Sequence, residues 1–262
     1  MNAMDGAIPL LTATGVSKQY GRRTAVDEVS LELWPGEVLA VVGESGSGKT
    51  TLLDCLAGRL RPDAGKVEYQ TRHEGVRDIH AMAEAERRLL ARTDWGYVHQ
   101  NPDQGLRMGV SAGANVGERL MALGARHYGN IRGEATDWLT RVEMDPARVD
   151  ERPSSFSGGM RQRLQIARNL VTRPRLMFMD EPTSGLDVSV QARLLDLLRS
   201  LTRSLPLAAI VVTHDLAVAR LLAHRMMVMK DGRAVESGLT DQVLDDPQHP
   251  YTQLLVSSVL QP

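Results

Sequence analysis

The sequence contains little cysteine and no excess of charge of either sign. Its single cysteine, Cys55, excludes an internal disulfide and any metal site built from several cysteines. The 31 Lys and Arg residues nearly balance the 32 Asp and Glu residues, which gives a formal net charge of −1. Because there is no overall basic field, nucleic acid is not an expected partner.

Long apolar segments are also missing. No apolar run approaches the roughly 18 residues that indicate a membrane-spanning helix, and the longest one, residues 205–212, contains a proline. Residues 1–5 lack the charged and apolar regions of a signal peptide. We therefore expect a cytoplasmic protein without direct membrane insertion.

The pattern that is present alternates short apolar strands with amphipathic helices. Strands are expected at residues 10–16, 26–33, 37–42, 66–70, 95–99, 176–179, 208–212, 226–229 and 234–236. Helices are expected at 51–57, 82–92 and 161–171, within 111–145, and along the leucine face of 194–201. Such alternation predicts an α/β fold with a mainly parallel sheet and a nucleotide at the carboxyl edge of that sheet.

Residues 43–50 read Gly-Glu-Ser-Gly-Ser-Gly-Lys-Thr, which fits the phosphate-binding pattern G-x-x-x-x-G-K-[ST]. The glycines let successive backbone N–H groups face a polyphosphate, and the strand and helix on either side place the phosphates at a helix N-terminus. Lys49 can reach the β- and γ-phosphates, and the Thr50 hydroxyl can bind Mg²⁺. The predicted phosphate contacts are Gly43, Ser45, Gly46, Ser47, Gly48, Lys49, Thr50 and Thr51.

Two adjacent acids, Asp180 and Glu181, end an apolar strand at 176–181. Asp180 is suited to hold Mg²⁺ through water, and Glu181 to polarise an attacking water molecule. Alone, this run is equally consistent with a surface loop, but after a phosphate loop it becomes a strong signal. Ser157 can cap the helix that follows it, with Gly158 and Gly159 exposing helix N–H groups to an anion. His214 lies at a strand end, where a catalytic role competes with a structural one.

These elements, in this order, resemble an ATP-binding-cassette (ABC) ATPase domain. The resemblance covers nearly the whole chain and depends on the phosphate loop, Gln100, the 157–159 signature, Asp180-Glu181, the 184–187 segment and His214. It implies a single domain over 1–262, with an antiparallel β-subdomain and an inserted helical subdomain. The nucleotide-binding core is expected at about 1–100 and 173–240, the helical subdomain at about 101–172 and a helical tail at about 241–262.

The resemblance also implies roles for individual residues. Tyr20 would stack on adenine, Gln100 would touch Mg²⁺ and the attacking water, and His214 would contact the γ-phosphate. Ser157, Gly158 and Gly159 would bind the γ-phosphate of ATP held by another protomer, and Asp187 would signal between the sites. The signature departs from the usual pattern at Phe156 and Met160, and we expect binding to survive. Because the chain has one loop and one signature, two cassettes are expected to work together, either as a homodimer or with a paralogue.

Two more specific resemblances imply different processes that ATP hydrolysis would drive. The tail at 249–255, His-Pro-Tyr-Thr-Gln-Leu-Leu, resembles ATPases of oligopeptide, dipeptide or nickel importers. Residues 34–37, 100–107, 110–113, 117–128, 190–196 and 238–241 are similar to the ATPase subunit of the carbon–phosphorus lyase system, which degrades phosphonates. The expected partners are therefore a second cassette and soluble lyase core subunits, with ATP and Mg²⁺ as cofactors.

Two further ABC classes fit less well. A chromosome- or repair-type ATPase needs sustained heptads, which this sequence lacks, and a ribosome-acting protein would carry two cassettes. Residues 101–128 directly follow Gln100, so we expect them to form the docking surface for the partner. They contain much of the sequence that departs from transporter cassettes, including Arg107, Arg119, Arg126, His127 and Tyr128. The alternative is that this segment is only the surface of the helical subdomain.

Overall fold

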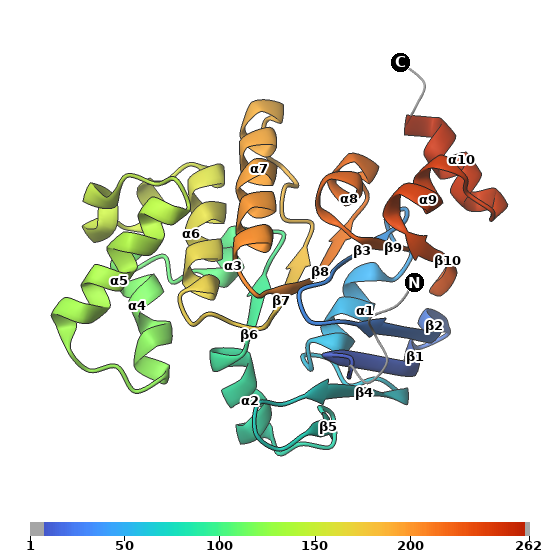
Figure 1. The fold of residues 1–262 in the computed structure, drawn as a ribbon, viewed down its shortest axis with the longest axis horizontal. Coiled ribbons are helices and arrows are strands. Elements are labelled where there is room, and N and C mark those ends of the chain that lie inside the picture. Colours follow the sequence, from blue (N-terminus) through green and yellow to red (C-terminus); the bar gives the residue numbers. More distant parts are fainter. Residues whose placement is uncertain (1–7, 260–262) are drawn as a thin grey trace. The chain divides into compact units, whose positions relative to one another are not determined.

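The computed structural model describes residues 8–259, so the expectation about a signal peptide at 1–5 and the end of the tail lie outside the described residues. The chain divides into two compact units (Figure 1), one formed by residues 1–87 with 212–262 and the other by residues 88–211. Each unit has its own strands and helices, and β8 (Ala208–Thr213) and α2 (Glu84–Thr93) cross the boundary in sequence.

An antiparallel sheet of four strands begins the first unit, in the order β2-β1-β4-β5. Its strands are β1 (Leu11–Tyr20), β2 (Arg23–Leu33), β4 (Ala64–Gln70) and β5 (Val76–Asp78). β1 pairs with β2 from Leu11↔Leu33 to Tyr20↔Arg23, across a two-residue turn. Alternating side chains of β2, such as Val29, Leu31 and Leu33, are buried, as expected for a sheet with one face against a core.

The first unit also contains a second set of strands, in the order β10-β9-β3. β3 (Val38–Val42) pairs in parallel with β9 (Arg225–Lys230), and β9 pairs antiparallel with β10 (Arg233–Leu239). α8 (Leu216–Leu222), α9 (Thr240–Asp245) and α10 (Pro250–Val259) pack on these strands through one apolar cluster. The helix α1 (Lys49–Leu56) follows β3 and buries Cys55, and this burial raises the pKa of the Cys55 thiol to about 12.

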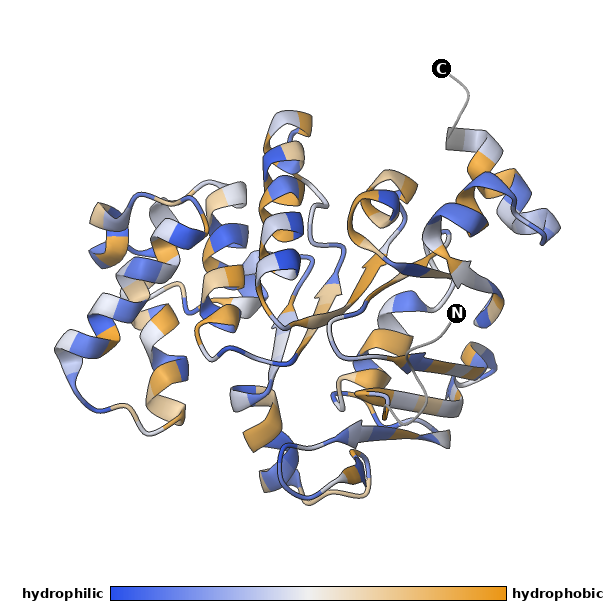
Figure 2. Cartoon of the chain, viewed as in Figure 1, coloured by the Kyte–Doolittle hydropathy of each residue, from blue (hydrophilic) through white to orange (hydrophobic). Residues whose placement is uncertain are grey.

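In the second unit the strands follow the order β8-β7-β6. β6 (Trp95–Val98) and β7 (Leu176–Asp180) are parallel, and every residue of β7 and β8 is buried. The long helix α7 (Val188–Ser204) buries Leu194, Leu197, Leu198 and Leu201, which is the leucine face expected from the sequence. Figure 2 shows the matching alternation of apolar and polar bands along α7.

The remaining helices of the second unit form a group around α6 (Gly158–Leu170). The group contains α3 (Pro102–Gly105), α4 (Ala112–Ala122), α5 (Tyr128–Arg141) and the 3₁₀ turns η1 (Pro146–Asp150) and η2 (Pro153–Ser155). Trp138 of α5 is fully buried here, and Arg163 of α6 donates to the Val142 carbonyl oxygen at 2.8 Å. α4, α5 and α6 lie side by side (Figure 1). The α/β class with a parallel core and an antiparallel β-subdomain is confirmed.

Candidate nucleotide-binding site

The phosphate loop lies between β3 and α1, as the sequence predicts. Gly48, the N-cap residue of α1, has φ 101°, and a Cβ atom there would collide with the carbonyl oxygen of Ala25. Gly43 would collide in the same way with the carbonyl oxygen of Met229. Glycine is therefore required at both positions, because side chains are excluded by close backbone approach as well as by conformation.

Lys49 is almost completely buried, with 6% of its surface exposed. Its ammonium group donates hydrogen bonds to the carbonyl oxygens of Gly43 and Glu44, both at 2.8 Å. A buried cation is costly unless acceptors surround it. The loop therefore curls around the Lys49 ammonium group, which places a positive charge where the β- and γ-phosphates of a nucleotide are expected.

Neighbouring segments of the same unit brace this loop. The N–H of Gly232, in the turn between β9 and β10, donates to the carbonyl oxygen of Ser47 at 3.0 Å. The guanidinium of Arg23, the first residue of β2, donates to the carbonyl oxygen of Gly46 at 2.9 Å. Motif reasoning missed Arg23, since the residue is far from the loop in sequence. The buried hydroxyl oxygen of Ser47 has no hydrogen-bond partner within the described part of the chain, so a phosphate oxygen would suit it.

Two more predicted residues belong to this unit. Tyr20 ends β1 with 52% of its surface exposed, so its ring face is open to a base, and the Lys18 ammonium lies 5.9 Å from the ring centroid. His214 is exposed directly after β8. The next residue, Asp215, caps α8 by accepting the N–H of Ala217 at 2.8 Å.

The acidic pair belongs to the second unit. Asp180 is the last residue of β7 and is 8% exposed. Glu181 follows in the left-handed region with φ 44°, which few residues with side chains adopt and which is common at functional sites. The chain then turns back, with the N–H of Ser184 donating to the Glu181 carbonyl oxygen at 3.0 Å. The amide nitrogen of Gln100 donates to the Ser184 hydroxyl at 3.2 Å, so Gln100 is linked to the loop that carries Glu181.

The signature residues begin α6. The Ser157 hydroxyl accepts the N–H of Met160 at 3.3 Å, so the predicted helix cap is confirmed. Ser157 and Gly158 are exposed, whereas Gly159 is buried, and a Cβ atom there would press on Val190 of α7. Glycine is therefore needed at position 159 because α6 and α7 pack closely there. Ser157 and Gly158, by contrast, remain open to a ligand.

The two departures from the usual signature have a structural explanation. Phe156 is 3% exposed, and the Arg148 guanidinium lies 4.9 Å from its ring centroid. The same guanidinium lies 3.3 Å from the sulfur of Met160. Both residues therefore pack around Arg148, and neither changes the exposed Ser157-Gly158 pair.

Asp187 is the N-cap residue of α7 and is exposed, and its side chain makes no capping hydrogen bond. The next residue, Val188, is the most exposed large apolar residue of the described part, at 84%.

The expected docking surface needs one correction. The Arg119 guanidinium donates to the carbonyl oxygens of Ala91 at 3.1 Å and Trp95 at 2.7 Å, and burial lowers its pKa to about 10. The prediction that Arg119 faces a partner is wrong, because this side chain holds α4 against the start of β6. Arg107 remains largely exposed, in an ion pair with Glu118, and Tyr128 is 73% exposed.

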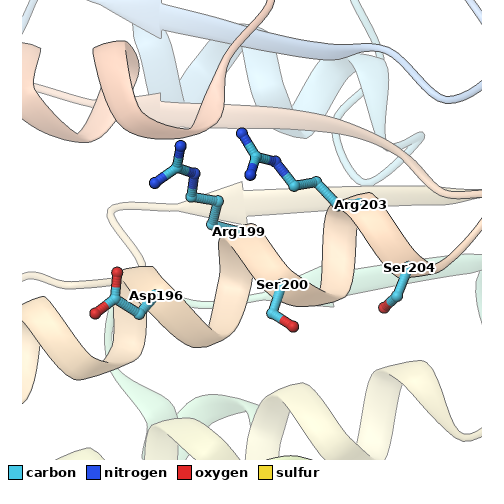
Figure 3. Close-up of a pocket in the computed structure, with 5 residues that line it drawn as sticks. All are labelled: Asp196, Arg199, Ser200, Arg203 and Ser204. Carbon is cyan, nitrogen blue, oxygen red and sulfur yellow. The ribbon is translucent and has the colours of Figure 1, made fainter.

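A described pocket is lined by residues other than these. It has a volume of about 430 Å³ and is lined by Asp196, Arg199, Ser200, Arg203 and Ser204 on the polar face of α7 (Figure 3). Both guanidinium groups project from the same side of the helix. None of the predicted nucleotide contacts lines this pocket, so it adds nothing to the candidate site.

The metal expected at the nucleotide site is Mg²⁺. Within residues 8–259 no three His, Cys, Asp or Glu side chains form a metal-binding group. Mg²⁺ commonly keeps several waters and binds substrate phosphates with one or two protein ligands, so the expected Mg²⁺ site does not depend on such a group. Over the same described residues, no helix has the length and apolar character needed to cross a membrane.

Known proteins match this chain over nearly its whole length. The sequence profile of the ABC transporter family matches residues 26–184, and that of the oligopeptide/dipeptide transporter C-terminal region matches residues 235–262. A protein of Escherichia coli strain K12 named "Putative phosphonates utilization ATP-binding protein PhnK" is 63% identical, over 97% of this chain and 98% of that protein. The dipeptide transport ATP-binding protein DppF of the same strain is 37% identical, over 95% of this chain and 76% of that protein.

Solved structures agree with these relatives. The ATP-binding cassette MJ0796, in a dimeric post-hydrolysis state bound to ADP and Pi, superimposes with a TM-score of 0.78 at 28% identity, covering 88% of this chain and 98% of that one. The phosphate loop, the acidic strand end and the helix-capping signature are thus accompanied by both the fold and the sequence of one family. The chain belongs to the ABC family and is an ABC-type ATPase.

Proposed function

We propose that this ATPase serves phosphonate catabolism in the cytoplasm, docked on soluble carbon–phosphorus lyase core subunits whose conformational cycle it drives. One observation carries the proposal. The similarity to the phosphonates utilization protein is 63% over almost all of both chains, whereas the dipeptide transport protein reaches 37%. The higher identity, together with coverage of 98% of the first protein against 76% of the second, favours a shared role with the first protein.

In this proposal each predicted residue has its own role in ATP binding or hydrolysis. Tyr20 stacks on adenine, and the residues of the 43–51 loop bind the phosphates, with the Lys49 ammonium on the β- and γ-phosphates. Glu181 accepts a proton from the attacking water, and His214 and Gln100 orient that water and the γ-phosphate. Thr50, Gln100 and Asp180 would hold Mg²⁺, which when bound neutralises charge on the phosphate oxygens.

The proposal includes a second cassette. Ser157, Gly158, Asp187 and Val188 are exposed in the chain, which leaves them available to another protomer. The MJ0796 cassette is dimeric in its ADP- and Pi-bound state. A composite site would take the signature from one protomer and the phosphate loop from the other, which explains why one chain carries one copy of each.

Affinity purification from the native organism tests this function. The tagged chain should recover lyase core subunits from the soluble fraction, and the recovered proteins are identified by mass spectrometry. A tagged Lys49→Ala chain, purified in parallel, shows whether recovery of the lyase core subunits depends on nucleotide binding. Recovery of integral membrane subunits alone would contradict the proposal.

One observation favours a second candidate, an importer ATPase of the oligopeptide or dipeptide class. The 235–262 match to the C-terminal region of those transporters covers a segment that the ABC family profile leaves out. In that case the chain would pellet with membranes and be released from them only by detergent or by removal of its membrane partner.

A further inference from the structure

Tyr251, in the tail helix α10, touches the phosphate loop. Its hydroxyl oxygen accepts the backbone N–H of Glu44 at 3.2 Å, across 207 residues of sequence. Tyr251 is only 6% exposed, so water does not readily replace this contact. Neither the phosphate-loop pattern nor the predicted nucleotide contacts include a residue of the tail.

The contact falls on a residue whose backbone Lys49 also contacts. The Lys49 ammonium donates to the carbonyl oxygen of Glu44, while Tyr251 accepts the N–H of the same residue. Glu44 is therefore fixed at its backbone donor by the tail and at its backbone acceptor by the phosphate-binding lysine. A shift of Tyr251 would tilt this residue and with it the carbonyl group that Lys49 contacts.

Tyr251 is itself held in place on several sides. Its ring packs in the cluster formed by β3, β9, α8 and α9, with the Lys230 ammonium 4.8 Å from the ring centroid. The backbone N–H of Tyr251 donates to the Nδ1 atom of His249 at 3.1 Å. The carboxylate of Glu236 on β10 accepts the N–H groups of Gln248 at 2.8 Å and His249 at 3.0 Å, which anchors the start of the tail helix.

The hydroxyl group remains protonated over the ordinary pH range. Burial raises the pKa of Tyr251, and the negative charge of Glu44 acts in the same direction. The hydroxyl oxygen therefore accepts the backbone N–H of Glu44 as part of an intact O–H group.

We propose that Tyr251 is a positioning residue of the nucleotide site, which sets the conformation of the phosphate loop through the peptide N–H of Glu44. This inference relies on the proposed role of residues 43–51 in phosphate binding. It gives the C-terminal segment a part in nucleotide affinity in addition to its packing role. Binding of another molecule to α10 would then change the affinity of the loop for ATP.

The variant Tyr251→Phe isolates the hydroxyl, because the ring and its packing remain. We expect the dissociation constant for ATP, measured by calorimetry on the full chain, to rise roughly 3- to 10-fold, the range for loss of one neutral hydrogen bond. The melting temperature without nucleotide should stay within about 4 °C of the wild type. The control is Tyr128→Phe, which removes an exposed hydroxyl on α5.

A second variant shows which part of Glu44 receives the effect. Glu44→Ala removes the carboxylate but keeps the N–H, so adding Tyr251→Phe to it should still weaken ATP binding by the same factor. Disappearance of the effect in that background would overturn the assignment to the backbone. Unchanged affinity in Tyr251→Phe, or an equal loss in Tyr128→Phe, would overturn the proposal itself. Lys49→Ala, run in parallel, separates these results from failure of the phosphate loop as the nucleotide site.

Discussion

At the scale of single residues, Lys49 illustrates how burial defines a binding group. The side chain is buried against two carbonyl oxygens, and its charge has no other cation beside it in the 43–51 loop. Lys49→Ala should weaken ATP·Mg²⁺ binding about 10- to 100-fold, the range for a hydrogen bond to a charged group. A calorimetric titration measures this change. Wild-type affinity in the variant would show that the loop is not the nucleotide site.

Glu181 differs from Lys49 because its expected role begins after binding. It follows the buried Asp180 in a strained backbone conformation, next to the loop to which Gln100 is bonded. Glu181→Gln keeps the size of the side chain but removes its basicity, so turnover should fall about 10²- to 10⁴-fold while ATP binding persists. Steady-state phosphate release measures turnover, and size-exclusion chromatography with ATP should reveal a trapped dimer. Wild-type hydrolysis would remove Glu181 from this role.

At the scale of elements, the signature helix α6 is tied to the strand that ends at Gln100. Gln165 of α6 is fully buried, accepts the N–H of His99 at 2.7 Å and donates to the carbonyl oxygen of His99 at 3.2 Å. The side-chain amide of Gln162 donates a second hydrogen bond to that oxygen, at 3.4 Å. These contacts connect α6, which Ser157 caps, to His99, the residue directly before Gln100. We therefore expect a shift of α6 to move Gln100, and a shift of Gln100 to move α6.

Gln165→Ala should loosen this connection. The change leaves the buried N–H and carbonyl oxygen of His99 with fewer partners, which is expected to lower the free energy of unfolding by about 1–3 kcal/mol. Thermal melting measures the loss. The control Arg193→Ala, at an exposed position of α7, should leave the melting temperature nearly unchanged. Equal melting temperatures for Gln165→Ala and wild type would show that water or a neighbouring side chain replaces the amide.

The elements were largely predictable from sequence, whereas their cross-contacts were not. Apolar runs predicted β3, β7 and β8 because both faces of these strands are buried. The strands expected at 226–229 and 234–236 are confirmed as β9 and β10, which pair with each other. The three-residue strand β5 was missed, since it has no buried residue to give a pattern. Arg23, Gln165 and Tyr251 act through backbone atoms of distant segments. Such contacts leave no local periodicity, and burial of Arg119 was misjudged for the same reason.

At the scale of the whole molecule, the proposed composite site would require two chains. Ser157→Arg places a long cation at the exposed start of α6 and should block closure, while leaving ATP binding to the single chain intact. Mixing Ser157→Arg with Lys49→Ala produces some dimers in which one site carries both defects and the other is intact. Hydrolysis should therefore recover in part on mixing.

The matched control for this mixing experiment is Ser154→Arg, three residues earlier at an exposed position of η2, which should hydrolyse ATP normally. Full activity of both Ser157→Arg and Lys49→Ala, each measured alone, would refute the two-chain arrangement.

The proposed docking on a partner also belongs to the scale of the whole molecule, and exposure separates the expected docking residues into two groups. Within the expected 101–128 segment, Met121, Leu123 and Tyr128 each expose half or more of their surface, and Arg107 is exposed beside Glu118. Apolar and aromatic groups gathered on a surface indicate a protein partner. Arg119 is bonded inward, so any variant of it would test folding of α4 instead of docking.

The variant Arg107→Glu combined with Tyr128→Ala should reduce recovery of the soluble lyase subunits at least about 10-fold, since it removes an aromatic contact and reverses a charge. Basal ATP hydrolysis should persist, because neither residue belongs to the nucleotide site. The control Arg203→Glu reverses a charge at an exposed position of α7. A parallel variant, Arg88→Glu with Arg92→Glu, tests α2, a basic helix that has no buried residue. Normal recovery of the first variant together with loss in the second would transfer the docking surface from the 101–128 segment to α2.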